Sequence, residues 1–267
     1  MNILIIGGGN MGMTFAKAFI NSHVVTAEQL MMLEKDKGDR ILQLKSKNIA
    51  RIYSDPAQCV PEADLIILAV KPQDAQTLFE QIADYVDNGQ VILSIMAGVK
   101  IKSIQQSIKV AKIIRAMPNL PAQIGQGMTA FVATEEVSRF EQGAIQNLLA
   151  TTGKTLNVDR EELIDVVTAI SGSGPAYIYY FMDSMINGAI EMGIKKSEAE
   201  LLVLHTFLGA LSLYQAHSYS CNDWIQKVAS KGGTTEAAIK TFNDSNLHSI
   251  IILGVKAALK RAIELGE

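Results

Sequence analysis

The first twelve residues constrain this chain most, because a short apolar run leads directly into closely spaced glycines. Residues 2–6 are almost wholly apolar, which is typical of a central parallel strand covered on both faces. Gly7, Gly9 and Gly12 follow in the G-x-G-x-x-G spacing, and an amphipathic stretch comes after them. In this motif the first glycine permits the tight turn, the second lets the backbone approach a pyrophosphate, and the third lets helix and strand pack closely. The pattern predicts a strand, a turn and a helix that together bind a dinucleotide.

The start of that helix is expected to hold the phosphates of the cofactor. A helix N-terminus offers free N–H groups and the positive end of the helix dipole. Asn10 is a suitable capping residue there, and Asn10 and Met11 complete the loop that we expect to contact the cofactor. The alternative is a glycine-rich turn in an α/β domain that binds no ligand.

A second short strand is predicted at residues 30–33, and it ends at Glu34. A carboxylate at this place accepts hydrogen bonds from the adenosine ribose hydroxyls, which favours NAD. Lys35, Lys37 and Arg40 lie close by in the sequence and offer charges for a 2′-phosphate. The choice between NADH and NADPH therefore stays open, and a solvated helix start is the alternative reading of this charge cluster.

Strands and helices alternate through the first half of the chain. Further strands are expected at residues 49–53, 64–70, 90–94, 112–117 and 155–158, with helices between them. Such alternation implies right-handed crossovers and a parallel sheet. Residues 119–133 are expected to add a pair of edge strands, and residues 135–152 a helix.

Beyond Val158 only helical periodicity is found. Helices are predicted at residues 161–170, 175–192, 197–214, 223–230, 234–242 and 247–265. Gly193 fits a helix C-terminus, and Ser197 and Asn246 fit N-caps. The predicted fold class is α/β, with an N-terminal Rossmann-type dinucleotide-binding domain (1–158) followed by an all-α domain (159–267). The helical half is so apolar that we expect it to pack against a second copy of itself.

Composition excludes several classes of function. The 267 residues carry a net charge of −3 without a basic block, which argues against nucleic acid as a partner. Cys59 and Cys221 form no C-x-x-C pair, and the four histidines lack metal-ligand spacing, so no disulfide framework and no metal site are expected. No signal peptide and no spanning helix is expected either, and the cytoplasm is the expected compartment.

Seven motifs, spread in order over the whole chain, together resemble the pyrroline-5-carboxylate reductase family, whose members catalyse the last step of proline synthesis. The motifs lie at residues 7–12, 69–72, 94–99, 114–119, 127–129, 171–177 and 230–237. The most specific are Ser-Gly-Ser-Gly-Pro-Ala-Tyr at 171–177 and the Gly-Gly-Thr-Thr loop at 232–235. The resemblance implies a Rossmann domain, a helical dimerisation domain with interleaved subunits capable of assembling further, and hydride transfer from NADPH or NADH to 1-pyrroline-5-carboxylate, giving L-proline.

The resemblance also implies site residues. Ala69, Val70, Lys71 and Pro72 would line the nicotinamide ribose, with Met96 and Ala97 nearby. The substrate carboxylate would be bound by a loop that comprises Ser230, Gly232, Gly233, Thr234 and Thr235, where the Thr235 hydroxyl lies beside the ring nitrogen and is the candidate catalytic group.

The residues support this interpretation from their chemistry, with an alternative for each. Closely spaced N–H groups at a helix start form an anion nest, but Thr234 or Thr235 as a plain N-cap is the alternative. For Lys71, the alternative to a cofactor contact is an exposed lysine at a helix start. Residues 171–175 are alternatively a helix break before a buried helix. The pair Glu161 and Glu162 is expected to compensate a helix dipole.

Two departures from the family pattern bear on function. Lys231 stands where the family usually has proline, and residues 224–226 replace a Leu-Lys-Asp-like stretch. Lys231 could strengthen carboxylate binding, or the changed loop could accept another imine or lose activity. The alternatives are therefore a reductase of another imine or keto acid on the same plan, and a non-catalytic protein that binds NAD(P)H. A β-hydroxyacid dehydrogenase would need a lysine that residues 171–180 lack.

Overall fold

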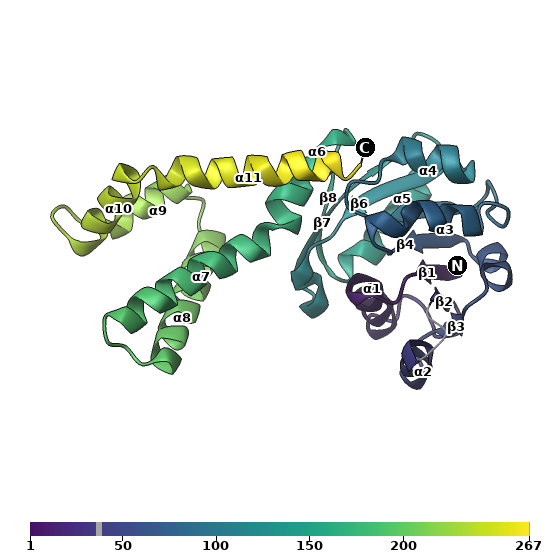
Figure 1. The fold of residues 1–267 in the computed structure, drawn as a ribbon, viewed down its shortest axis with the longest axis horizontal. Coiled ribbons are helices and arrows are strands. Elements are labelled where there is room, and N and C mark those ends of the chain that lie inside the picture. The colour runs from purple at the N-terminus through teal and green to yellow at the C-terminus, as the bar shows by residue number, and fades with distance from the viewer. Residues whose placement is uncertain (36–38, 267) are drawn as a thin grey trace. The chain divides into compact units, whose positions relative to one another are not determined.

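The computed structural model describes the backbone of residues 1–35 and 39–266, with the side chains of residues 39 and 40 left out. The chain forms two compact units (Figure 1). One unit comprises Met1–Ser173 together with Ala258–Glu267, and the other comprises Gly174–Ala257.

The first unit is built on a sheet whose described strands run in the order β3-β2-β1-β4-β5-β6-β7-β8. All neighbouring pairs are parallel except β6 and β7, which are antiparallel. The strands are β1 Ile3–Ile6, β2 Leu30–Leu33, β3 Arg51–Tyr53, β4 Leu65–Leu68, β5 Val91–Ser94, β6 Ile113–Met117, β7 Gly127–Ala133 and β8 Gly153–Asn157. The expected pair of edge strands at residues 119–133 is wrong. A 3-10 helix, η4 (Leu120–Ile124), replaces the first of them, because Pro121 lies in its first turn and cannot donate to a strand ladder.

Strand β1 lies between β2 and β4, so the strand order changes direction at its edge. Ile3 pairs with Leu30 on one side and with Leu65 on the other. In open parallel sheets, ligands bind beyond the carboxyl ends of the strands at such a switch point. The loops after β1, β2 and β4 therefore define where a site is to be sought.

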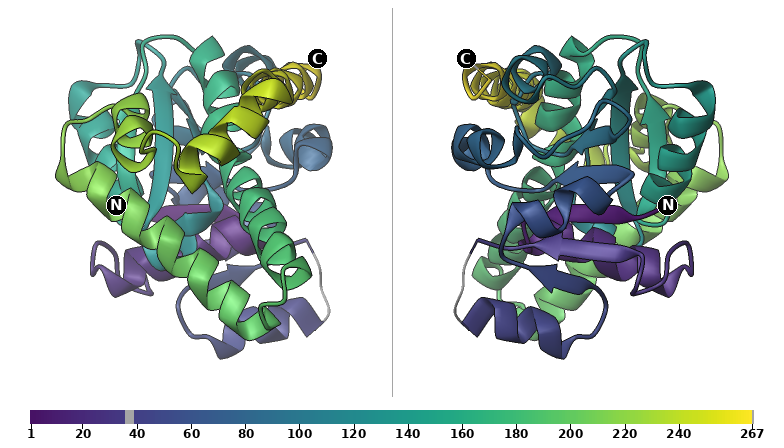
Figure 2. Two further views of the ribbon diagram at one scale, coloured as in Figure 1. Left: turned by 90° about the vertical axis from the view of Figure 1, so that its left-hand side faces the viewer. Right: turned by 90° about the vertical axis from the view of Figure 1, so that its right-hand side faces the viewer.

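Helices cover both faces of this sheet (Figure 2). Successive side chains of β1 point to opposite faces, and all of them are apolar. Ile3 and Ile5 pack with Phe15 of α1 on one face, whereas Leu4 and Ile6 pack with Phe79 of α3 on the other. The helices of this unit are α1 Asn10–Asn21, α2 Asp39–Ser46, α3 Ala75–Ile82, α4 Ile101–Ile108, α5 Arg139–Ala150 and α6 Glu162–Val167, with 3-10 turns η1 Pro56–Gln58, η2 Val60–Glu62 and η3 Pro72–Asp74.

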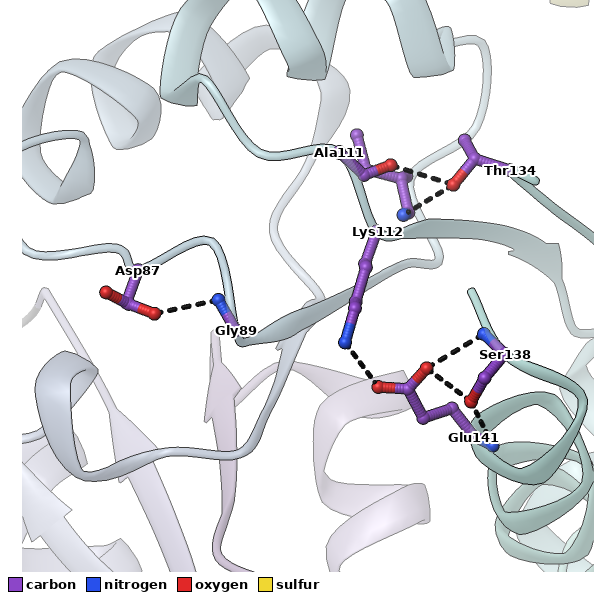
Figure 3. Close-up of polar contacts among 8 residues, drawn as sticks. Asp87, Gly89, Ala111, Lys112, Thr134, Ser138 and Glu141 are labelled. Atoms are coloured by element: carbon purple, nitrogen blue, oxygen red, sulfur yellow. Dashed lines mark hydrogen bonds and ion pairs between the residues drawn. The ribbon is translucent and has the colours of Figure 1, made fainter. Parts of the chain in front are cut away.

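Helix α5 begins at a capping box, four residues later than the sequence pattern suggests. The Glu141 N–H donates to the Ser138 hydroxyl at 3.2 Å, and the Ser138 N–H donates to the Glu141 carboxylate at 2.8 Å (Figure 3). Lys112, at the end of the loop before β6, reaches the same carboxylate at 2.7 Å. The cap thus joins the helix to the start of β6, inside the sheet.

Helix α6 continues into a π-helical turn, η5 (Thr168–Gly172), in which the Ser173 N–H donates to the Thr168 carbonyl at 2.9 Å. Helix α7 (Gly174–Glu191) follows directly, and none of its residues is buried within the single chain. The α-helical pattern is thus interrupted here, by the π-turn and a bend at Ser173, and the helix that follows is not buried within the single chain. A π-turn widens a helix locally and is often found at functional sites.

The second unit is all-helical. It holds α7, with α8 Lys196–Ala216, α9 Cys221–Val228, α10 Thr234–Asp244 and the first part of α11 Leu247–Glu264. Gly193 ends α7 in the left-handed region, with a φ of 97°, as predicted. The N-cap of α8 is Lys195, without a side-chain bond, so the expectation for Ser197 is wrong.

Apolar side chains remain exposed over this second unit. Tyr180 is 75% exposed, Met192 81% and Leu253 64%, whereas only Ala199 and Val203 of α8 are buried. Helix α8 is also long and apolar enough to cross a membrane by length and composition, contrary to expectation. The same composition is found in helices that pack in a protein interface, so this finding alone does not indicate a membrane.

Candidate functional site

The glycine-rich turn after β1 is shaped by close backbone contacts. Gly7 has a φ of 105°, and its N–H donates to the Leu33 carbonyl at 3.0 Å. A Cβ atom on Gly7 would lie 2.7 Å from the Ala69 carbonyl oxygen, and one on Gly12 would collide with the Gly7 carbonyl. These two glycines therefore allow the packing that the motif predicts.

Gly9 differs, because the space beside it is open. It is the N-cap of α1, with a φ of −67° and a ψ of −173°, and a Cβ atom there would meet nothing within 4 Å. Asn10 is the first helical residue, so the prediction that Asn10 caps the helix is wrong. The extended backbone of Gly9 takes that place. The open cradle, at the N-terminus of a 12-residue helix, fits a pyrophosphate.

Glu34 lies against this turn. Its carboxylate accepts from the Gly8 N–H at 2.8 Å and from the Lys35 N–H at 3.0 Å. The Lys35 side chain is exposed. Lys37 lies outside the described residues, as does the side chain of Arg40.

A cavity of about 450 Å³ opens beside Glu34, beyond the carboxyl ends of β1 and β2. This is the size of a small-ligand pocket. Its lining is Ile6, Gly7, Leu33, Glu34, Lys35, Ser54, Asp55, Pro56, Val70, Asp74, Thr77, Leu78, Gln81 and Tyr85. The mixture of apolar faces and polar groups suits a nucleoside.

The loops after β4 and β5 adjoin the turn. The Ala69 N–H donates to the Ile6 carbonyl at 2.9 Å, so the segment from Ala69 to Pro72 leaves the sheet next to the glycines. Lys71 is exposed and extended, immediately before η3. Met96 is 2% exposed and packs in the core under α3 and α4, while Ala97 is half-buried.

A buried ion-pair cluster escaped the sequence analysis. Arg115 of β6 is 1% exposed and donates to Glu161 at 2.9 Å and to Asp165 at 2.5 Å. Glu161 also accepts from the Ile101 N–H at 2.8 Å, so its role as a mere dipole compensator is corrected. The signal was available, since an arginine inside an apolar strand requires buried carboxylate partners.

Asn119 joins three of the family-like motifs within the first unit. Its amide nitrogen donates to the Ser171 hydroxyl at 3.2 Å, and its amide oxygen accepts from the Met128 N–H at 2.9 Å. The end of β6 is thereby tied to β7 and to the π-turn.

The second unit carries the predicted substrate loop, between α9 and α10. Gly232 has a φ of 72°, and the Gly233 N–H donates to the Ser230 carbonyl at 3.0 Å. A Cβ atom on Gly233 would lie 2.6 Å from the Ser230 hydroxyl oxygen. This compact turn brings the five predicted residues of the loop together and leads straight into a helix of 11 residues.

Helix α10 is capped by Gly233, so the alternative in which Thr234 or Thr235 is the N-cap is wrong. Both threonines lie in the first turn, where N–H groups have no intrahelical acceptor. The Gly232 N–H donates to the Glu236 carboxylate at 2.7 Å, which holds the loop closed. The N–H groups of the first turn are left to bind an anion, at a helix start that also carries the Glu236 carboxylate.

The two departures from the family pattern have different settings. Trp224 packs its ring 5.4 Å from that of Tyr219 and 5.7 Å from that of His217, between centroids. It is therefore part of an aromatic cluster at the start of α9. Lys231 is exposed on the loop. Across the described residues, no group of three or more His, Cys, Asp or Glu side chains could hold a metal ion.

Comparison with known proteins gives two family-profile matches. A profile described as pyrroline-5-carboxylate reductase dimerisation matches residues 161–265, and one described as NADP oxidoreductase coenzyme F420-dependent matches residues 2–98. Pyrroline-5-carboxylate reductase 2 of Bacillus subtilis is 32% identical over 98% of this chain and 94% of its own length. The Aquifex aeolicus pyrroline-5-carboxylate reductase is 30% identical over 99% of this chain and 97% of its own.

Solved structures agree. A pyrroline-5-carboxylate reductase from Coxiella burnetii superposes with a TM-score of 0.89 at 32% identity, covering 100% of this chain and 98% of that one. The Plasmodium falciparum pyrroline carboxylate reductase with NADP bound has a TM-score of 0.90 at 23% identity, with the same coverage, and at that identity it shows the fold alone.

Proposed function

The chain belongs to the pyrroline-5-carboxylate reductase family, and from that premise we propose that it reduces 1-pyrroline-5-carboxylate to L-proline with NADPH or NADH. The observation that carries the proposal is the open cradle at Gly9, placed at the switch point of a Rossmann-type sheet. The open space beside Gly9 lets a phosphate approach the backbone at the helix start.

The cofactor contacts are proposed as follows. The turn from Gly7 to Gly12 would hold the pyrophosphate, with N–H groups of Asn10 and Met11 at the helix start. Glu34 and Lys35 would border the adenosine ribose. The segment from Ala69 to Pro72, together with Ala97 and the backbone of Met96, would border the nicotinamide end.

The substrate contacts are proposed on the loop of Ser230, Gly232, Gly233, Thr234 and Thr235. Backbone N–H groups in the first turn of α10 would bind the carboxylate of the pyrroline ring. Lys231 is exposed on the same loop and brings a positive charge to it. By function we divide the chain into a dinucleotide-binding domain (1–158) and a substrate and dimerisation domain (159–267), whereas the compact units divide after Ser173.

When bound, the reduced nicotinamide supplies the hydride that adds to the imine carbon. The protein's own contribution is then to hold the ring and to stabilise charge. The ring nitrogen takes its proton from solvent, so Thr235 acts by hydrogen-bonding and orienting that nitrogen rather than as a strong acid.

The exposed apolar helices of the second unit are proposed to pack against a second copy of the chain. A cavity of about 550 Å³ in this unit is lined almost entirely by apolar side chains of α7, α10 and α11. Its lining is Tyr177, Tyr180, Phe181, Ser184, Met185, Phe242, Leu247, Ile250, Ile251, Gly254 and Val255. A homodimer would cover this surface. Two free cysteines, Cys59 and Cys221, suit a reducing compartment, and we place the enzyme in the cytoplasm.

The test is the absorbance of the reduced nicotinamide, followed with purified protein, pyrroline-5-carboxylate and each cofactor in parallel. Cofactor oxidation that requires the imine, with L-proline as the product, is the expected result. In a matched reaction with a keto acid in place of the imine, the absorbance of the reduced cofactor should stay constant. Cofactor binding without oxidation by the imine would contradict the proposal.

A further inference from the structure

We infer that this enzyme binds NADH in preference to NADPH, and that Glu34 is the residue that sets the preference. The inference rests on the proposed function for its choice of cofactor. It goes beyond it because family membership leaves both nicotinamide cofactors open.

The position of the Glu34 carboxylate is fixed by the turn itself. The buried Gly8 donates its N–H to one carboxylate oxygen at 2.8 Å, and Lys35 donates its N–H to the other at 3.0 Å. A Cβ atom on Gly8 would lie only 2.7 Å from the carboxylate, so the two groups are in close contact. Bonds to both oxygens hold the carboxylate in one place.

That place is the wall of the cavity beyond β1 and β2. A dinucleotide whose pyrophosphate lies on the Gly9 cradle directs its adenosine ribose toward the end of the second strand. The ribose 2′- and 3′-hydroxyls of NADH can donate to a carboxylate there. The 2′-phosphate of NADPH can only present further negative charge to it.

The other described side chains of the lining are also acidic on balance. Besides Glu34 they include two carboxylates, those of Asp55 and Asp74, against one ammonium group, that of Lys35. The Lys35 side chain is exposed and is the single cation among the described side chains of the lining. Among the described side chains of the lining, a 2′-phosphate would therefore meet net negative charge.

The experiment is a calorimetric titration of the full-length protein with NADH and with NADPH. The variant Glu34→Gln keeps an oxygen acceptor for the Gly8 N–H but removes the charge. The matched control, Glu80→Gln, removes the same charge from α3 outside the cavity. We expect NADPH to bind at least about tenfold more weakly than NADH to the unaltered protein, and the two constants to come within about threefold in Glu34→Gln.

Salt provides a second readout. Because charge repulsion is screened, raising the ionic strength from about 0.02 to 0.5 M should narrow the gap between the cofactors in the unaltered protein but not in Glu34→Gln. The Glu80→Gln control should retain the full gap.

The outcomes separate this inference from the proposed function. NADPH binding as tightly as NADH, or more tightly, to the unaltered protein overturns the preference, and it would indicate that the basic residues after Glu34 hold the phosphate. An unchanged ratio in Glu34→Gln overturns the role of Glu34. Tight, selective NADH binding without pyrroline reduction would support the preference while contradicting the reductase function.

Discussion

The Lys112 ammonium group lies 2.7 Å from the Glu141 carboxylate, which at the same time accepts from the N–H and hydroxyl of Ser138 (Figure 3). The bond from Lys112, followed by that from Ser138, lowers the pKa of Glu141 from 4.5 to about 2. Because the folded-state pKa is depressed, this group stabilises the protein above about pH 4.5. That contribution is lost as the pH falls from there toward 2.

Replacing Glu141 by Gln should therefore destabilise the protein by about 1–2 kcal/mol at pH 7, a value reduced from the full shift because the side chain is partly exposed. The measurement is urea unfolding at fixed protein concentration, at pH 7 and at pH 3. The gap between the variant and the unaltered protein should shrink at pH 3. The control Glu136→Gln should stay within about 0.5 kcal/mol at both pH values. An equal gap at both pH values would contradict the charge argument.

Substitutions of two glycines in the first turn should have different effects, one on cofactor binding and the other on stability. Gly9→Ala adds a methyl group to open space, so the melting temperature should stay within about 2 °C while the dissociation constant of NADH rises about tenfold or more. Gly12→Ala instead drives a methyl group into the Gly7 carbonyl and should cost about 2 kcal/mol or more of stability. Thermal melts and calorimetric titrations of both variants provide the comparison. Unaltered NADH affinity in a folded Gly9→Ala protein would contradict the assignment of the space beside Gly9 to the cofactor site.

Thr235→Ala should lower kcat for pyrroline-5-carboxylate by about ten- to a hundredfold, because the ring nitrogen loses its orienting hydroxyl. The dissociation constant of NADH should be nearly unchanged. Thr235→Ser restores the hydroxyl and should recover most of the rate, and Thr234→Ala is the neighbouring control, for which only the KM is expected to rise. Steady-state kinetics decide the matter, and full activity in Thr235→Ala would eliminate the assigned role.

Asp165→Ala leaves the Arg115 guanidinium buried with one partner fewer, and should destabilise the protein by about 3–5 kcal/mol. Replacing both residues, as Arg115→Met with Asp165→Leu, should recover much of that loss because no buried charge is left unpaired. Chemical unfolding of the single and double variants measures both values. A single variant that loses less than about 1 kcal/mol would show that water reaches the arginine.

The start of the chain was predictable because its local signals agree. The apolar run, the glycine spacing and the amphipathic helix all require the same unit, and Gly7 and Gly12 take the positions that the motif gives them. Within this unit the cap was misassigned. Asn10 is the better capping residue by type, but the extended backbone at Gly9 decides where the helix begins.

Features that depend on contacts distant in sequence were predictable only in part. Arg115 inside an apolar strand signals buried carboxylate partners, but Asp165 is 50 residues away, so no periodicity identifies it as the partner. The prediction of a pair of edge strands at residues 119–133 failed for a similar reason. The position of β7 depends on its pairing with β6 on one side and with β8 on the other. The segment before β7 has no such partner, and the proline directs it into a turn. The assignments on the substrate loop stay predictions until substrate binding is measured.

Because α7 and α8 bury few residues within one chain, each copy in a dimer would rely on its partner to cover these helices. Folding of the helical half would then require association of two chains and would depend on protein concentration. A tenfold dilution would lower the apparent free energy of dimerisation by about 1.4 kcal/mol. A chain synthesised in the absence of a second copy would leave its apolar helices exposed to water, and it would therefore be prone to aggregate. By the same logic, one damaged copy would disable a sound one, so that a mutation in this half would act dominantly in a mixed population.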